Sequence, residues 1–305
     1  MKRILVIRGG AIGDFILTLP ALKALREANP DAEIDVLGYK HIAELVNNRF
    51  YANCVRSIEY GPLSRFFAKD SELCSDLKSY FAGFDLVVSY LFDPDQIFEN
   101  NVRRCGVGQF IRGPAKIDAG EHAARQLAQP LEQLGLTVDE LRAKLYPSAA
   151  DRQVAREFLR HSSQPIVAFH PGSGGEGKNW PLENWIALGN TLLTSLDFGG
   201  SILVVCGEAD ETKTHRLKPI WKNPRVQFAE NLTLPHLAAV LEHVTFVGHD
   251  SGISHLAAAV GSNCILLFGP TDPDVWAPQG ENVRIIRAPN GDLRDLRVET
   301  VIREL

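Results

Sequence analysis

The chain has 305 residues, 45% of them hydrophobic, which is enough to fill the cores of two domains of ordinary size. Its formal net charge of -5 argues against bulk attraction to nucleic acid, and five scattered cysteines without C-x-x-C spacing argue against a disulfide framework or a zinc site. The first apolar run, Ile4 to Ile7, is too short for a signal peptide, and no stretch approaches the length of a membrane span. A cytoplasmic protein is therefore predicted.

The first half of the chain predicts strands and helices in alternation. A buried strand at Arg3–Arg8 leads into a turn marked by Gly9, Gly10 and Gly13, and apolar residues then recur at helical spacing over residues 15–25. Further strands are predicted at residues 33–37, 55–60, 85–90 and 105–111, and further helices at residues 42–46, 63–81 and 119–134.

Residues 141–165 break this alternation with turn residues and a charged helical patch, which indicates a linker and a domain boundary near residue 150. The alternation then restarts. Strands are predicted at residues 166–170, 201–206, 225–228, 244–249 and 264–268, and helices at residues 183–196, 210–217, 234–241, 252–260 and 296–305. Such alternation implies an α/β protein with two doubly wound parallel sheets, whose strands would direct their carboxyl ends into a cleft between the domains.

The loop after the first strand, residues 9–14, carries Gly9, Gly10 and Gly13 but lacks the G-x-G-x-x-G order of a dinucleotide site. Asp35 lies inside a strand pattern and not at the end where a ribose-binding carboxylate would stand. Asp14 closes the loop. It is either a general base for a substrate hydroxyl or a cap for the following helix, and both interpretations remain open.

The loop at residues 170–181 follows a strand and precedes a helix. Its glycines allow close backbone approach, Ser173 offers a hydroxyl, and Lys178 offers a cation for a phosphate oxygen. Asn179 after the lysine breaks the G-x-x-x-x-G-K-[ST] order, so a P-loop is excluded. The alternative for Lys178 is a solvated surface lysine.

A third loop, residues 249–252, opens an alanine-rich helix, where backbone N–H groups and the helix dipole favour a phosphate. Asp250 would cap this helix or bind a hydroxyl. His255 is either a packed core residue or a neutral donor to a phosphate or sugar oxygen. No histidine pair has metal-ligand spacing, so no metal site is predicted, and no Gly-x-Ser-x-Gly nucleophile motif is present.

Three strings in this order, GAIGDFILTLPAL, HPGS followed by KNWP, and HDSGISHLAAAVG followed by LFGPTDP, resemble glycosyltransferase family 9, the ADP-heptose:lipopolysaccharide heptosyltransferases. The resemblance covers essentially the whole chain. It implies a GT-B fold, with residues 1–150 as the acceptor domain, 151–292 as the nucleotide-sugar domain, and 293–305 as a closing helix that packs back toward the first domain. It also implies an inverting transfer without a metal.

The same resemblance assigns site residues. Asp14 matches the general base of the family, and Glu208 is the candidate for binding the nucleotide ribose, a role for which Glu211 competes. The donor-binding residues that it implies are Gly13, Ser173, Lys178, Glu208, Asp250, Ser251, Gly252 and His255.

The predicted function is transfer of a heptose or related sugar from an ADP-sugar, which is a substrate and not a cofactor, to a glycan or glycolipid of the lipopolysaccharide type. A lipid-linked acceptor would bring the protein to the cytoplasmic face of the inner membrane. The alternatives are a nucleotide-sugar-binding protein without catalysis and a nicotinamide-dependent oxidoreductase. Five basic residues either meet an acidic acceptor or are solvated surface charges: Arg65, Arg103, Arg104, Arg112 and Lys116.

Overall fold

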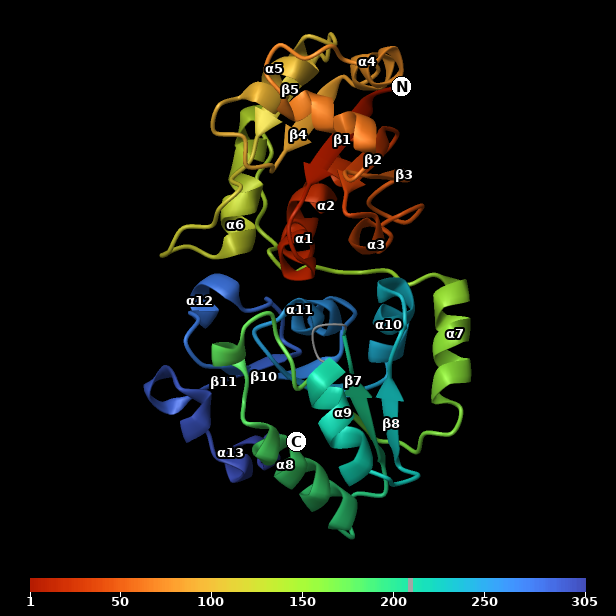
Figure 1. The fold of residues 1–305 in the computed structure, drawn as a ribbon, viewed down its shortest axis with the longest axis vertical. Helices are drawn as coiled ribbons and strands as arrows, with labels where there is room; N and C mark the ends of the chain where they lie inside the picture. The colour runs from red at the N-terminus through yellow and green to blue at the C-terminus, as the bar shows by residue number, and fades with distance from the viewer. Residues whose placement is uncertain (208–210) are drawn as a thin grey trace. The chain divides into compact units, whose positions relative to one another are not determined.

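A computed structural model describes residues 1–207 and 211–305. The described chain divides into two compact units, Met1–Leu141 and Arg142–Leu305 (Figure 1). Within these described ranges, no helix is both long enough and apolar enough to cross a membrane.

The first unit is built on a five-stranded, wholly parallel sheet in the order β3-β2-β1-β4-β5. Its strands are β1 (Arg3–Arg8), β2 (Glu33–Gly38), β3 (Cys54–Ser57), β4 (Leu86–Ser89) and β5 (Gln109–Arg112). The central strand β1 is buried from Ile4 onward. Its continuous apolar run is typical of a parallel strand that is covered on both faces.

Helices cover this sheet. Alternate strand residues such as Leu5, Ile7 and Val87 pack in one cluster with Phe81 and Phe98 from two of the helices. The helical segments of the unit are α1 (Ile12–Leu17), α2 (Leu19–Ala28), α3 (Lys40–Ala43), η1 (Gly61–Phe67), α4 (Ser75–Ala82), α5 (Ile97–Arg103), α6 (Ala123–Ala128) and η2 (Gln129–Leu134).

The second unit holds a six-stranded parallel sheet in the order β11-β10-β9-β6-β7-β8. Its strands are β6 (Ile166–Phe169), β7 (Ser201–Val205), β8 (Val226–Ala229), β9 (Thr245–His249), β10 (Asn263–Phe268) and β11 (Val283–Arg287). Counted within the unit, this is the strand order of a dinucleotide-binding fold.

Helices also cover the second sheet. Their bounds are α7 (Ala149–Leu159), α8 (Leu182–Thr194), α9 (Glu211–Ile220), α10 (Leu234–Leu241), α11 (Gly252–Ala259), α12 (Pro273–Trp276) and α13 (Val298–Ile302), with short η3 (Glu176–Lys178), η5 (Pro289–Gly291) and η6 (Leu293–Asp295). Trp180, Trp185 and Trp221 lie in the core on the face that carries α8, α9 and α13.

Both strand orders confirm the predicted pair of doubly wound parallel sheets. Several elements differ from the sequence interpretation. The helix predicted over residues 63–81 is divided into η1 and α4, and α12 was not predicted. Helix α5 and strand β11 were not predicted, and α7, in the segment taken as a linker, packs against α10 within the second unit (Figure 1). Within that unit α13 packs against α8, and the expected approach of residues 293–305 to the first domain stays a prediction.

Each sheet has one point where the strand order reverses. In the first unit β1 and β4 are neighbours; β2 and β3 follow β1 on one side of the sheet, and β5 follows β4 on the other. In the second unit β6 and β9 are neighbours in the same way, with β7 and β8 on one side and β10 and β11 on the other. At such a switch point the loops after the two strands separate and leave a crevice at the carboxyl edge, which is where open α/β sheets bind ligands. The three glycine-bearing loops leave β1, β6 and β9, so all of them lie at these two points.

Candidate functional site

Asp14 stands at the switch point of the first sheet, in the first turn of α1. Its Oδ2 accepts the backbone N–H of Ala11 at 2.9 Å, and its Oδ1 lies 3.4 Å from the Arg8 guanidinium. Asp14 therefore helps to cap the helix from its third position, where its carboxylate accepts the N–H of the N-cap residue Ala11. The base interpretation stays open, since the side chain is still 35% exposed.

One glycine of this loop, Gly10, has a structural explanation. Gly10 has a φ of 93°, in the left-handed region that favours glycine, and a Cβ on it would lie 2.9 Å from Oδ2 of Asp14. Gly10 thus makes room for the Asp14 carboxylate, so the loop is built to hold that side chain.

Arg8, at the end of β1, was not recognised in the sequence because it is indistinguishable there from an ordinary strand terminus. Its side chain is buried, lies over the Tyr90 ring at 5.7 Å, and donates to the backbone carbonyl of Asp14 from both Nε and Nη2, at 3.3 and 3.2 Å. Burial lowers the pKa of Arg8, while the Asp14 carboxylate opposes that shift. Arg8 fixes both the backbone and the side chain of Asp14.

A cavity of about 420 Å³ opens beside Asp14 and lies wholly within the first unit. Loops that follow β1 to β5 line it, so it occupies the carboxyl edge of the sheet. Aromatic residues make up much of its wall, namely Tyr39, Phe67, Tyr90 and Phe92.

In the second unit the loops after β6 and β9 are joined by an ion pair. Nζ of Lys178 lies 2.6 Å from Oδ2 of Asp250. An ammonium has three donors, so this contact leaves Lys178 with further N–H groups for a ligand oxygen. The pair holds the Lys178 ammonium beside the first turn of α11, which begins at Gly252.

His249 makes a second link between these loops and was also missed in the sequence. Its Nε2 accepts the backbone N–H of Trp180 at 2.8 Å, so the ring proton is on Nδ1, which faces the carbonyl of Gly172 at 3.5 Å. Burial, with a smaller contribution from His170, lowers the pKa of His249 to about 3. The ring is neutral at physiological pH and clamps the Lys178 loop from within the core.

Ser251 is the N-cap of α11. Its Oγ accepts the N–H of Ser254 at 3.3 Å, and Oγ of Ser254 in turn bonds the carbonyl of His249. The start of α11 is thereby fixed against the end of β9. His255 lies further into the helix and is only 4% exposed, so its role as a ligand contact stays a prediction.

Other predicted donor contacts are less well defined. The hydroxyl of Ser173 bonds within its own loop, to the carbonyl of Gly175 at 3.0 Å. Gly13 lies inside α1 in the first unit. Glu208 lies outside the described residues, so the choice between Glu208 and Glu211 for the ribose stays open.

The basic residues considered for an acidic acceptor have partners inside the first unit. Arg103 bonds the buried Glu99 at 2.8 Å, and Arg112 forms an ion pair with the same carboxylate. Arg104 donates to Asn101, and the Lys116 ammonium lies 5.0 Å from the centre of the Phe92 ring. Arg65 donates to a backbone carbonyl. Two of the five basic residues thus share the single carboxylate of Glu99.

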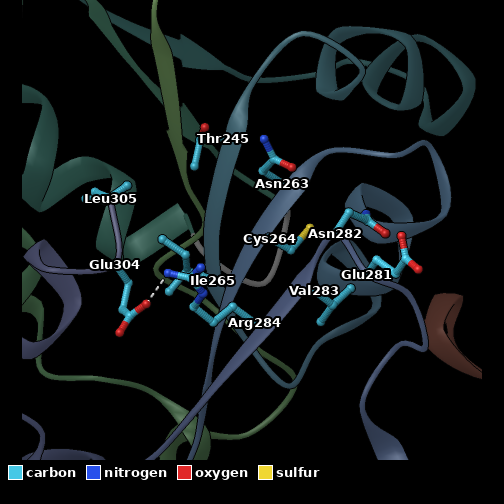
Figure 2. Close-up of a pocket in the computed structure, with 10 residues that line it drawn as sticks. All are labelled: Thr245, Asn263, Cys264, Ile265, Glu281, Asn282, Val283, Arg284, Glu304 and Leu305. Atoms are coloured by element: carbon cyan, nitrogen blue, oxygen red, sulfur yellow. Dashed lines mark hydrogen bonds and ion pairs between the residues drawn. The ribbon is translucent and has the colours of Figure 1, made fainter.

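Figure 2 shows another cavity, of about 390 Å³, at the amino ends of β9, β10 and β11. Thr245, Asn263 and Val283, the first residues of those strands, line it, and an ion pair between Arg284 and Glu304 stands beside it. It lies at the sheet edge opposite His249, and no predicted site residue within the described chain lines it.

Comparison with known proteins adds the family. The model of glycosyltransferase family 9 (heptosyltransferase) matches residues 114–304, more than half of the chain. The chain belongs to glycosyltransferase family 9. Lipopolysaccharide heptosyltransferase 3 of Escherichia coli is 26% identical over 93% of this chain and 88% of its own length.

Solved structures show the same fold. E. coli ADP-heptose lps heptosyltransferase II aligns with a TM-score of 0.79 at 20% identity, covering 100% of this chain and 97% of that one. E. coli heptosyltransferase WaaC, solved with ADP-2-deoxy-2-fluoro heptose, aligns with a TM-score of 0.72 at 21% identity, covering 99% and 98%. The predicted GT-B fold is therefore confirmed for this member of family 9.

In the described part of the chain, no three His, Cys, Asp or Glu side chains gather closely enough to hold a metal ion. Metal-independent transfer stays a prediction for this family 9 protein.

Proposed function

We propose that this family 9 protein is an inverting, metal-independent glycosyltransferase that moves a heptose or related sugar from an ADP-sugar to a hydroxyl of a lipopolysaccharide core or similar glycan. The observation that carries the proposal is the family match over residues 114–304. The relatives are lipopolysaccharide heptosyltransferases, and WaaC was solved with an ADP-heptose analogue. ADP-heptose is therefore the proposed donor.

The second unit supplies the proposed donor site. In an inverting displacement the bond from the anomeric carbon to the diphosphate breaks, and the leaving ADP takes the electron pair. Lys178 and the N–H groups at the start of α11 are cationic or positively polarised groups that would stabilise this charge. The Lys178–Asp250 pair at 2.6 Å supports this role because it holds the ammonium beside that helix end.

The first unit supplies the proposed base. A carboxylate of Asp14 would accept the proton of the acceptor hydroxyl, whose oxygen forms the new bond to the anomeric carbon. Support comes from Arg8, which holds Asp14 by its backbone and side chain, and from the cavity that Asp14 lines. A glycan or glycolipid would occupy that cavity, and a lipid-linked acceptor would bring the protein to the inner membrane surface.

The test uses the whole protein. We expect ADP-heptose to raise the melting temperature, since a ligand that binds only the folded state stabilises it, and we expect ADP release when a heptose-deficient lipopolysaccharide is added. NMR of the product should show inverted anomeric configuration, and EDTA should leave the rate unchanged. Donor binding without transfer to any such acceptor would favour a binding protein, and a shift with NAD but not with ADP-heptose would favour an oxidoreductase.

A further inference from the structure

The cavity beside Asp14 has the size of a small-molecule site. Its volume of about 420 Å³ lies within the roughly 300–1,000 Å³ of ligand pockets. It stands at the switch point between β1 and β4, where ligands of such sheets bind. The wall therefore determines which acceptor can present a hydroxyl to Asp14.

Three aromatic rings on this wall are exposed. Phe92 is 65% exposed, Phe67 44% and Tyr39 37%. Large exposed rings gathered at one concave site mark a surface that a ligand covers. The flat C–H face of a pyranose is the part of a glycan that stacks on an aromatic ring, while its hydroxyls remain at the edge for hydrogen bonds.

The charge on the wall disfavours an anion. Among the described residues that line the cavity, Asp14 and Glu59 are acidic and Arg8 is basic, which leaves one carboxylate in excess. Arg8 is already engaged by Asp14 at 3.4 Å. Arg103 and Arg112 do not line the cavity, and both form ion pairs with the buried Glu99. An acidic sugar or a phosphate would meet Glu59 here, while the lining cation, Arg8, is already paired with Asp14.

We propose that this cavity binds an uncharged pyranose of the acceptor, stacked on Phe92 and Phe67 and with a hydroxyl directed at Asp14. This inference rests on the proposed function and specifies the sugar that receives the transferred unit. Lys116 is the strongest opposing feature because it is a cation near the site. Its ammonium lies over the Phe92 ring, 5.0 Å from the centre, and Lys116 does not line the cavity.

The test compares matched pairs of sugars that differ in one charge. Ligand-observed NMR with millimolar methyl glucoside, galactoside, mannoside and heptoside is set against the methyl glucuronide, galacturonide and mannuronide. We expect at least one neutral glycoside to bind, and each uronide to bind more weakly than its neutral partner. Tighter binding of the uronides, or no binding of any neutral glycoside, would overturn the proposal.

Variants test the wall itself. Phe92→Ala should weaken the neutral glycoside roughly 2- to 10-fold, the range expected for one aromatic contact. Phe50→Ala removes another exposed phenylalanine of the same unit that does not line the cavity, and Lys116→Gln removes the cation. Both controls should bind as the wild type does. An unchanged affinity in Phe92→Ala, or a loss in Lys116→Gln larger than in Phe92→Ala, would contradict the proposal.

Titration of ADP-heptose in the same samples separates this proposal from the proposed function. Donor binding without any neutral glycoside binding would refute the acceptor inference alone. Neutral glycoside binding without donor binding would refute the donor assignment and would still support the cavity beside Asp14 as a site for a neutral sugar.

Discussion

The two units place the same pair of charges at the same topological position with opposite exposure. At the switch point of the first sheet the cation, Arg8, is 6% exposed and the carboxylate, Asp14, is 35% exposed. At the switch point of the second sheet the cation, Lys178, is 38% exposed and the carboxylate, Asp250, is 10% exposed. In each unit the more exposed member can meet a ligand, and the more buried member holds it.

Under the proposed function, this inversion would separate the two halves of a displacement reaction. An exposed carboxylate can accept a proton from an incoming hydroxyl, and an exposed ammonium can meet a leaving diphosphate. The same topology thus offers two different sites because the residue types in the loops differ. Substitution of Asp14 should consequently lower the transfer rate, and substitution of Lys178 should weaken donor binding.

The largest effect is expected from Asp14→Asn. The amide keeps the size and can still accept the Ala11 N–H, but it cannot take a proton, so we expect the transfer rate to fall by about 10²- to 10⁴-fold. Initial rates of ADP release at saturating donor measure this. Asp31→Asn, at an exposed aspartate of the same unit, is the control and should retain full activity. An Asp14→Asn variant with undiminished turnover would contradict the assignment of the base.

A smaller effect is expected from Lys178→Ala. Loss of a hydrogen bond to a charged ligand should weaken ADP about 10- to 100-fold while adenosine, which lacks the diphosphate, changes little. Calorimetric titration of both ligands measures the difference. Lys222→Ala, at an exposed lysine of the same unit, is the control. Equal losses for ADP and adenosine would show that the substitution disturbs the loop and not a phosphate contact.

The smallest effect is expected from loss of the hydrogen bond between His249 and the backbone of Trp180 in the Lys178 loop. His249→Leu leaves the N–H of Trp180 without its acceptor, which we expect to lower the free energy of unfolding by about 1–3 kcal/mol at pH 7.5. Urea denaturation measures this loss, which should come with a modest weakening of ADP.

The pH dependence of that loss has a defined sign. His249 stays neutral in the folded state down to a pKa of about 3, whereas in the unfolded chain it binds a proton near pH 6.5. The unfolded state therefore binds more protons below pH 6.5, and the wild type loses up to about 1.4 kcal/mol per pH unit that His249→Leu does not lose. The stability gap should narrow from pH 7.5 to pH 5. If the difference in the free energy of unfolding between the wild type and His249→Leu stays constant over this pH range, the assignment of a neutral His249 is contradicted.

What could be predicted from the sequence follows from how local each signal is. Strand β1 and the three loops were predicted because apolar runs and glycines are local patterns. Helix α5, with the sequence IFENNVR, has too few apolar residues for a clear helical period, although Phe98 and Val102 are buried in the core.

The residues that position the site, His249 and Arg8, could not be identified from the sequence for a different reason. The partner of His249 is the backbone of Trp180, 69 residues away in the chain. Arg8 is recognisable only once its burial against Tyr90 is known. Likewise, the pairing of Arg103 and Arg112 with Glu99 required the fold. Sequence patterns indicated which groups could do chemistry, and the tertiary contacts indicate which of them are held and which are already occupied.

The central claim is that the exposed carboxylate of one unit serves rate and the exposed ammonium of the other serves donor affinity. Calorimetric titration of ADP-heptose into Asp14→Asn and Lys178→Ala tests it directly. The account predicts that Asp14→Asn binds the donor within a few fold of the wild type while Lys178→Ala loses about 10- to 100-fold. Donor binding that is lost in Asp14→Asn and retained in Lys178→Ala would contradict it.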